Sequence, residues 1–296
     1  MVGTGMDECR IEDERIQRVN GVDLCSQAFG EPSDPAVLLI AGRDSSMDWW
    51  EDDFCRRLAV GGRYVVRYDL RDTGRSTTYP AGEPDYSFAD LVDDAVGILD
   101  AREIASAHVV GISMGGALAQ WLGVLHRDRV ESLTLVDTSG ALPGMPDDLP
   151  PPEPELADYF RSGGLRPEDA TDTAAVVEHV VEGQRAFARG PFDEDRWRSI
   201  ATRVVQRMPS VPGGLGNHGV MRDCPSPDAG LGEITVPTLV VHGTADPLFP
   251  LPHGRALARA IPGATLLPLE GVGHEAPPPS TWDVVVPALL RLTGNR

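Results

Sequence analysis

Apolar residues follow two different spacings in the first half of the chain, and the two spacings alternate. Short apolar runs predict buried strands at 36–41, 63–69 and 132–136. Apolar residues recurring every three or four positions predict helices at 50–59, 88–100 and after Ser113. A hairpin with an Asn20-Gly21 turn precedes them, with strands at 14–19 and 22–29. Strands that alternate with helices indicate an α/β protein with a parallel, doubly wound sheet and a site at the strands' carboxyl ends.

The pattern changes at Thr138 and changes back near Ile234. Residues 138–233 have no convincing strand pattern; a proline-rich stretch at 149–154 is followed by helical spacings near 155–162, 173–188 and 193–207. Strands at 238–241 and 264–267 then alternate again with helices at 254–260 and from about 281. We therefore predict a core domain made of 1–137 and 234–296, into which a helical cap (lid) domain, 138–233, is inserted.

Composition argues against several classes of function. The net charge of −19 makes nucleic acid or an anionic membrane an unfavourable partner. All 26 Lys and Arg positions are arginine, which rules out catalysis by lysine. No apolar run is long enough to cross a bilayer, and residues 1–18 lack the apolar centre of a signal peptide. The four cysteines have no metal-binding spacing, so we expect free thiols, a cytoplasmic protein and no metal or cofactor. The oligomeric state stays open.

The strongest chemical signal is the segment Gly111-Ile-Ser113-Met-Gly115, which ends an apolar run and begins a helical pattern. Strand, G-x-S-x-G and helix together are typical of a nucleophile elbow, in which a strained turn lifts the serine hydroxyl clear of the sheet. The flanking glycines are needed because strand and helix pass too close for a Cβ. We predict Ser113 as the nucleophile.

Two loops after later strands carry the residues that such a serine requires. Asp246 follows the strand at 238–241, and His274 follows the next strand. A serine nucleophile needs a base to take its proton and a carboxylate to orient that base. The chain order Ser113, Asp246, His274 is the order found in this kind of fold, and we predict these three as the catalytic set.

Other titratable residues have competing interpretations. Asp137 also ends a strand and is an alternative acid, whereas Asp69 is expected to anchor the loop that follows it. His242 is expected to be a packed or hydrogen-bonded structural histidine. For His179 and His218, solvent exposure and contact with the substrate both stay open.

Two backbone N–H groups are predicted to form an oxyanion hole. The Met114 N–H lies at a helix N-terminus, where negative charge is stabilised. Gly42 lets the loop after 36–41 turn so that the Arg43 N–H points at the same place.

Apolar side chains of the predicted cap are the candidates for substrate contact, together with one residue of the loop that follows Arg43. The predicted substrate-binding residues are Trp49, Tyr159, Phe160, Phe187, Trp197 and Met208. A cap this apolar favours a bulky hydrophobic or aromatic acyl group over a charged metabolite.

With these residues in place, the chain resembles the α/β-hydrolase superfamily, and within it the aclacinomycin methylesterases, which remove a methyl ester from an anthracycline polyketide. The segments that carry the resemblance are 38–49, 52–58, the loop at 67–78 and Pro252-His-Gly254. It covers the core, about two thirds of the chain. It implies a mostly parallel eight-stranded sheet flanked by helices, and a small-molecule ester substrate. Most relatives have His-Gly where this chain has Ala41-Gly42, and the Arg43 side chain is larger than its counterpart.

Three functions compete at this point. The first is a serine esterase acting on an alkyl (methyl) ester of a bulky hydrophobic or polyketide-like molecule. The second is different chemistry on the same scaffold, either a cofactor-free haloperoxidase-like activity or C–C bond hydrolysis. The third is a non-catalytic ligand-binding member of the fold. Serine at 113 excludes the epoxide hydrolase and haloalkane dehalogenase mechanisms, which need aspartate there.

Overall fold

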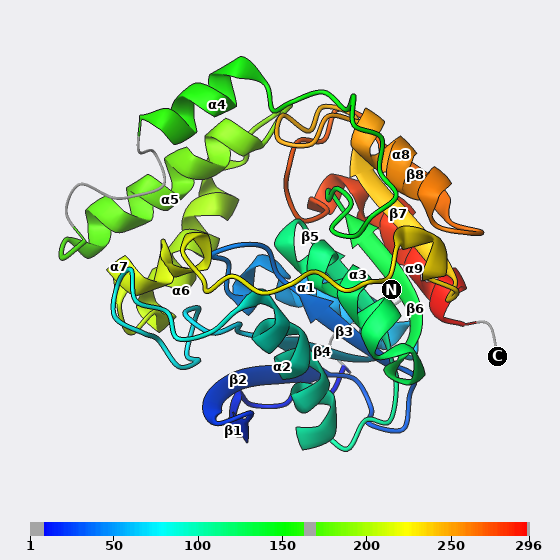
Figure 1. Ribbon diagram of the computed structural model, residues 1–296. Helices are drawn as coiled ribbons and strands as arrows, with labels where there is room; N and C mark the ends of the chain where they lie inside the picture. The colour runs from blue at the N-terminus through cyan, green and yellow to red at the C-terminus, as the bar shows by residue number, and fades with distance from the viewer. Residues whose placement is uncertain (1–8, 163–169, 295–296) are drawn as a thin grey trace, which may run out of the picture.

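The computed structural model describes residues 9–162 and 170–294, and its centre is one eight-stranded sheet in the order β1-β2-β4-β3-β5-β6-β7-β8 (Figure 1). Its strands are β1 (Arg15–Val19), β2 (Val22–Phe29), β3 (Ala36–Ile40), β4 (Tyr64–Tyr68), β5 (Ala107–Ile112), β6 (Val130–Val136), β7 (Thr238–Gly243) and β8 (Thr265–Leu269). Strands β3 to β8 pair in parallel, whereas β1–β2 and β2–β4 are antiparallel. The predicted mostly parallel α/β sheet is confirmed.

The N-terminal hairpin is closed by the turn that the sequence predicts. Val19 pairs with Val22, so only Asn20 and Gly21 lie between the strands. Both have positive φ, 47° and 81°, which the tightest hairpin turns require at both central positions.

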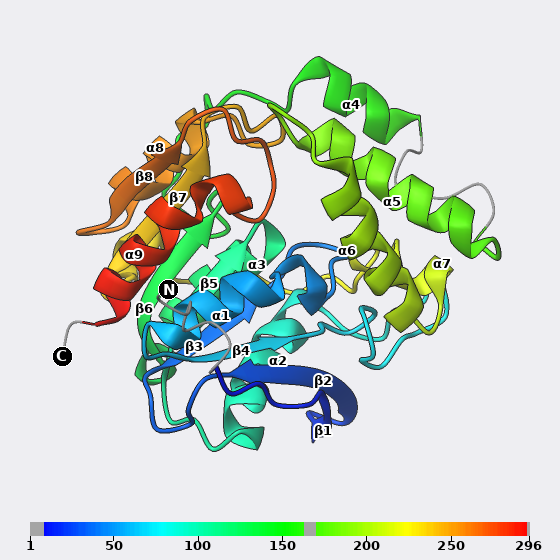
Figure 2. The ribbon, with the colours of Figure 1, turned by 180° about the vertical axis from the view of Figure 1, so that it is seen from behind.

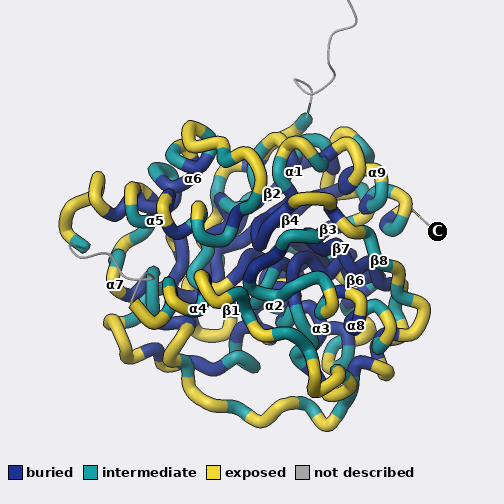
Figure 3. The backbone as a smooth tube through the Cα atoms, turned by 90° about the horizontal axis from the view of Figure 1, so that it is seen from above, coloured by how far each residue is buried: buried dark blue, intermediate teal, exposed yellow. Residues whose placement is uncertain are grey.

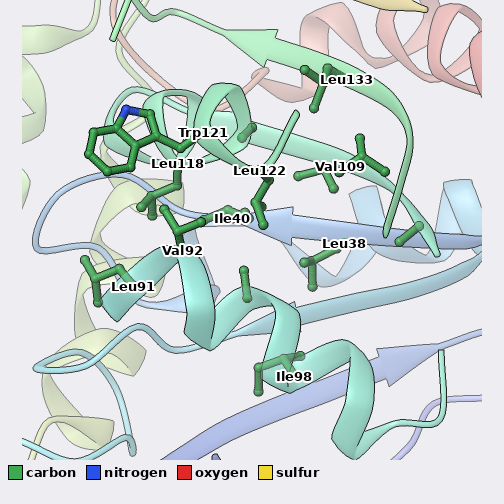
Figure 4. Close-up of a cluster of buried hydrophobic side chains, with 14 of the residues drawn as sticks. Leu38, Ile40, Leu91, Val92, Ile98, Val109, Leu118, Trp121, Leu122 and Leu133 are labelled. Atoms are coloured by element: carbon green, nitrogen blue, oxygen red, sulfur yellow. The ribbon is translucent and has the colours of Figure 1, made fainter. Parts of the chain in front are cut away.

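Helices cover both faces of the sheet. On one face lie α2 (Phe88–Ala101), α3 (Met114–Leu125) and α8 (Pro252–Ala260), and on the other α1 (Asp52–Val60) and α9 (Trp282–Thr293) (Figures 1 and 2). Figure 4 shows the first face, where Val92 of α2 and Leu118 and Leu122 of α3 lie around Ile40 of β3. Seen from above, the strands form the buried centre of the molecule (Figure 3). Helix α1 begins two residues later than predicted because 47–49 form a 3-10 turn.

The described part of 138–233 is mainly helical. It contains α4 (Pro154–Arg161), α5 (Thr173–Phe187), α6 (Glu194–Arg207) and the short α7 (Val211–Gly214), which lie together beside the sheet in both ribbon views. Helices α5 and α6 pack through buried side chains that include Val177, Val181, Ala201 and Val205. The three longer helices match the predicted spans to within two residues.

An ion-pair cluster joins α6 to the sheet. Arg207 donates to Asp69 Oδ2 at 2.6 Å and to Asp48 Oδ2 at 2.5 Å, and all three side chains are buried. Asp69, directly after β4, also accepts from the backbone N–H groups of Met47 and Arg75, each at 2.9 Å. Asp69 therefore anchors its loop as expected, and it binds α6 as well.

Candidate active site

Ser113 lies in a sharp turn between β5 and α3. Its φ of 53° and ψ of −119° are strained for a residue with a side chain, and such strain is concentrated at functional sites. A Cβ at Gly111 would overlap the Gly115 backbone, and one at Gly115 would overlap the carbonyl oxygens that end β3. The turn can therefore form only with glycine on both sides of the serine. The Ser113 carbonyl is held by the Thr138 hydroxyl at 2.8 Å.

Two backbone N–H groups lie close to Ser113 from different elements. Met114 is the first residue of α3, so its N–H has no partner within the helix. Gly42 lies beside Ser113: a Cβ on it would be 3.4 Å from the serine Cβ, so the loop with Arg43 passes close to the serine. Neither the Met114 nor the Arg43 N–H donates a hydrogen bond to another described backbone group.

His274 and Asp246 form a buried pair. The His274 Nδ1 atom lies 2.8 Å from Asp246 Oδ2, while the other oxygen, Oδ1, accepts from the N–H groups of Leu248 and Phe249 at 2.7 and 2.9 Å. Burial alone would raise the pKa of Asp246, but His274, and after it the Phe249 N–H and His242, outweigh burial and hold that pKa below its usual range. An ionised carboxylate here keeps the proton of a neutral His274 ring on Nδ1 and leaves Nε2 able to accept one.

Two aromatic rings fix the position of His274. The Phe187 and Phe249 ring centres lie 5.8 and 5.6 Å from that of the histidine. The backbone N–H of His274 also donates to the Phe187 carbonyl at 3.0 Å. Helix α5, which ends at Phe187, therefore takes part in holding the histidine.

Asp137 lies near the pair but is not joined to His274. Its Oδ1 accepts from the Gly243 N–H at 2.7 Å, and its Oδ2 is buried without a partner among the described residues. Burial, and then the charge of Asp246, raise the pKa of Asp137 well above its usual range. Asp137 therefore contacts the backbone at Gly243, whereas Asp246 is the carboxylate placed to orient the histidine.

The same neighbourhood contains the one group in the described residues with metal-ligand spacing. Ligand atoms of Asp137, His242 and Asp246 lie within 4.8 Å of one another. However, both Asp246 oxygens are already bonded, and His242 Nε2 lies 2.7 Å from the Phe249 carbonyl. A cation here would share the Asp246 carboxylate with His274. His242 is hydrogen-bonded and buried, in line with the structural role expected for it.

The predicted nucleophile, base and oxyanion-hole residues share one cavity of about 820 Å³. Ser113, His274, Arg43 and Met114 all line it. So do four of the predicted substrate-binding residues, namely Trp49, Tyr159, Phe160 and Phe187. The walls are thus formed by the core elements on one side and by α4 and α5 on the other.

The structure does not bring Trp197 and Met208 to this cavity. Trp197, on α6, is 2% exposed and packs against Trp49, with ring centres 5.2 Å apart. Met208 packs on the same buried cluster, which also contains Ile200 and Val204. These side chains contact other parts of the protein because the apolar face of α6 is turned toward α5 and the core. Neither side chain is among the residues that line the cavity with Ser113, in contrast to the other four predicted substrate-binding residues.

His179, for which contact with the substrate stayed open, lines the cavity, and several other cavity residues were missed from the sequence. His179 and Gly183 lie on the same face of α5 as Phe187, four residues apart, and Gln184 lies beside them. Helical spacing could have identified Gly183 and Gln184, because they lie four and three residues before the predicted Phe187, and residues at these spacings share a helix face. Leu248 and Phe249 also line the cavity, at positions set by the turn that Asp246 forms. His218, by contrast, is buried away from it.

The chain belongs to the α/β-hydrolase fold family, whose sequence pattern matches residues 35–278. It is 34% identical over 270 residues to rhodomycin D methylesterase DauP from Streptomyces sp. (strain C5), which covers 86% of this chain and 90% of that protein. Rhodomycin D methylesterase DnrP from Streptomyces peucetius is 33% identical, with the same coverage. The family and these relatives show that this chain is a carboxylic ester hydrolase. The predicted resemblance to methylesterases of this superfamily is confirmed.

A solved structure agrees on the fold. The enol-lactonase from Burkholderia xenovorans LB400 superimposes with a TM-score of 0.71 at 22% identity, covering 95% of this chain and 100% of that one. At this identity the likeness concerns the fold alone. Within the described residues, no helix has both the length and the apolar character needed to span a membrane.

Proposed function

We propose that the protein hydrolyses a carboxylic ester through an acyl-enzyme on Ser113, with His274 as base and Asp246 as its orienting acid. The observation that carries this proposal is the 2.8 Å contact between His274 Nδ1 and Asp246, on the cavity that Ser113 also lines. The Asp246 carboxylate holds the imidazole in the tautomer that accepts a proton at Nε2 and stabilises the charged ring that results.

The reaction has two halves. Ser113 Oγ attacks the ester carbonyl carbon and passes its proton to His274, giving a tetrahedral oxyanion that the Arg43 and Met114 N–H groups stabilise. The carbon–oxygen bond to the alcohol breaks, and His274 returns the proton to the leaving oxygen. Water then attacks the acyl-enzyme with His274 as base, and the free acid leaves as Ser113 regains its proton.

We propose further that residues 138–233 form a cap over this site. We also propose that the substrate is a small alkyl ester, specifically a methyl ester, of a bulky hydrophobic or polyketide-like acid. A cavity of about 820 Å³ has room for a multi-ring acyl group, and Trp49, Tyr159, Phe160 and Phe187 offer it aromatic walls. The two similar proteins named as rhodomycin D methylesterases support the same substrate class. The four cysteines are free, which supports a reducing, cytoplasmic location.

The test compares kcat/KM for two sets of esters. Methyl esters of naphthoic and anthracene carboxylic acids represent the proposed class, and p-nitrophenyl acetate and butyrate represent short acyl groups. We expect a kcat/KM at least tenfold higher for the bulky methyl esters after correction for the intrinsic reactivity of each ester. Turnover of short acyl groups alone would contradict the substrate class and leave a general esterase. No turnover of either set, with no reaction at Ser113, would contradict the mechanism.

A further inference from the structure

His218 bridges two backbone loops, one of which carries Arg43. It lies in the 3-10 turn η3 (Asn217–Gly219), and its side chain has no exposed surface. Its Nδ1 accepts from the Asp44 N–H at 2.8 Å, and its Nε2 lies 2.9 Å from the Arg71 carbonyl oxygen. Because an N–H can only donate and a carbonyl can only accept, the ring is neutral with its proton on Nε2. Burial favours the same state, since it lowers the pKa of His218.

The bond to Asp44 acts on the residue next to it, Arg43. Asp44 has a φ of 54°, a left-handed conformation that needs support in a residue with a side chain. The peptide between Arg43 and Asp44 is held at its N–H by His218 and at its carbonyl by the Ser45 hydroxyl, at 3.1 Å. The Gly42 carbonyl accepts from the Ser45 N–H at 3.3 Å. Together these bonds set the orientation of the peptide unit that contains the Arg43 N–H.

The turn that carries His218 is held in place by other contacts. Asn217 donates to the Tyr79 and Pro80 carbonyls at 3.3 and 3.2 Å and accepts from the Gly82 N–H at 2.8 Å. Gly219 packs against the Arg43 guanidinium so closely that a Cβ there would overlap it. A change at His218 therefore removes the bond to Asp44 while the turn keeps its own anchors.

We propose that His218 is a positioning residue for the oxyanion hole: its Nδ1 holds the Asp44 N–H, and thereby aims the adjacent Arg43 N–H at the oxyanion formed on Ser113. This inference rests on the proposed function. On this proposal His218, which lies outside the cavity, contributes to transition-state stabilisation and does not bind the ester itself.

Three variants separate hydrogen bonding from packing. In His218→Asn the side-chain oxygen occupies the place of Nδ1 and can still accept from the Asp44 N–H. In His218→Gln the amide reaches the place of Nε2 and keeps only the bond to Arg71. His218→Phe fills the space without either bond, and His126→Asn, at a partly exposed position paired with Asp93, serves as the control. For each, kcat and KM are measured on the methyl ester of a naphthoic acid, and thermal midpoints are recorded.

A boronic acid adds a readout that a purely structural role would not move, because its adduct with a serine places an oxygen in the oxyanion hole. Its affinity is measured by tryptophan fluorescence, independently of turnover. We expect His218→Phe and His218→Gln to lower kcat by about 10- to 100-fold, below the 10²–10³ typical of a hole donor removed outright. Their KM should change less than threefold, and the boronic acid should bind more weakly by a similar factor to the loss in kcat. His218→Asn should recover most of both.

Two results would overturn the assignment. One is wild-type kcat in all three variants, and the other is an equal loss in all three that follows the thermal midpoint, because the Asn variant then gives no rescue. If the wild-type protein itself neither hydrolyses the ester nor binds the boronic acid, the proposed function fails, and with it any hole for His218 to position. An active wild type with unaffected variants removes only the inference about His218.

Discussion

His274 Nδ1 and Asp246 Oδ2 lie 2.8 Å apart although 28 positions separate them in the sequence. They meet because β7 and β8 are parallel neighbours, and each residue belongs to the loop that follows one of these strands. The carboxyl ends of parallel strands open on the same edge of a sheet, which is where open α/β folds carry their sites. Ser113, at the carboxyl end of β5, faces the same cavity.

Removing the serine hydroxyl or the imidazole should abolish turnover. We expect Ser113→Ala and His274→Ala each to lower kcat by at least about 10⁴-fold, because the members of a triad act as a unit. The double variant should be no worse than the worse single one. Steady-state kinetics with a naphthoic methyl ester provides the measurement, with circular dichroism to confirm folding. Losses that multiply in the double variant would show that the two residues act independently.

The two aspartates should respond differently to the same change. Asp246→Asn should lower kcat by about 10²- to 10⁴-fold, since an amide in this place can favour the wrong histidine tautomer. Asp137→Asn should keep kcat within about fivefold of the wild type, because its carboxyl makes no bond to His274. The reverse ranking in the same assay would make Asp137 the orienting acid.

Asp137→Asn should also change how stability depends on pH. Burial and the charge of Asp246 raise the pKa of Asp137 in the folded protein. A group that binds its proton more tightly when folded contributes stability that is complete below its unfolded pKa, near 4, and is lost as pH rises toward the folded pKa. Asparagine has no such equilibrium and can still accept from the Gly243 N–H.

The free energy of unfolding, measured with urea at pH 4 and pH 7, tests this dependence. Between these values the Asn variant should gain at least about 1 kcal/mol relative to the wild type. A difference between the two proteins that is the same at both pH values would show that Asp137 ionises normally in the folded state.

Variants at Phe160 and Trp197 distinguish a side chain that contacts the substrate from one that only packs in the protein interior. Phe160 lines the cavity, so Phe160→Ala should lower kcat/KM for a bulky methyl ester by about tenfold and leave the thermal midpoint nearly unchanged. Trp197 is buried behind Trp49, and Trp197→Ala should cost about 3–5 kcal/mol of stability. At a temperature where both variants are folded, the ratio of bulky to short ester turnover should fall only for Phe160→Ala.

The sequence predicts the core more fully than the 138–233 segment, for a physical reason. Strands such as β3 are covered by helices on both faces, so each reads as an unbroken apolar run. The nucleophile elbow can be predicted equally well from the sequence, because the strand and the helix approach so closely that only glycine fits at positions 111 and 115. Both signals are local, and neither depends on what a distant part of the chain does.

Residues of the helical segment depend on distant partners. Periodicity shows that α6 has an apolar face. It does not show that this face packs against α5 and Trp49, which is why Trp197 and Met208 were expected at the cavity that they do not line. His218 gives no signal of its own: its partners, Asp44 and Arg71, lie 174 and 147 positions away. Only the folded chain shows that its ring reaches the loop of Arg43.

The central claim, an acyl-enzyme on Ser113, is tested most directly by covalent labelling with a fluorophosphonate followed by peptide mass spectrometry. The account predicts one phosphonyl group per chain, located on Ser113, and methyl ester hydrolysis that falls in proportion to labelling. It also predicts that Ser113→Ala takes up no label. A chain that is fully labelled at Ser113 yet hydrolyses the ester at the wild-type rate would contradict it, as would loss of activity through labelling at another residue.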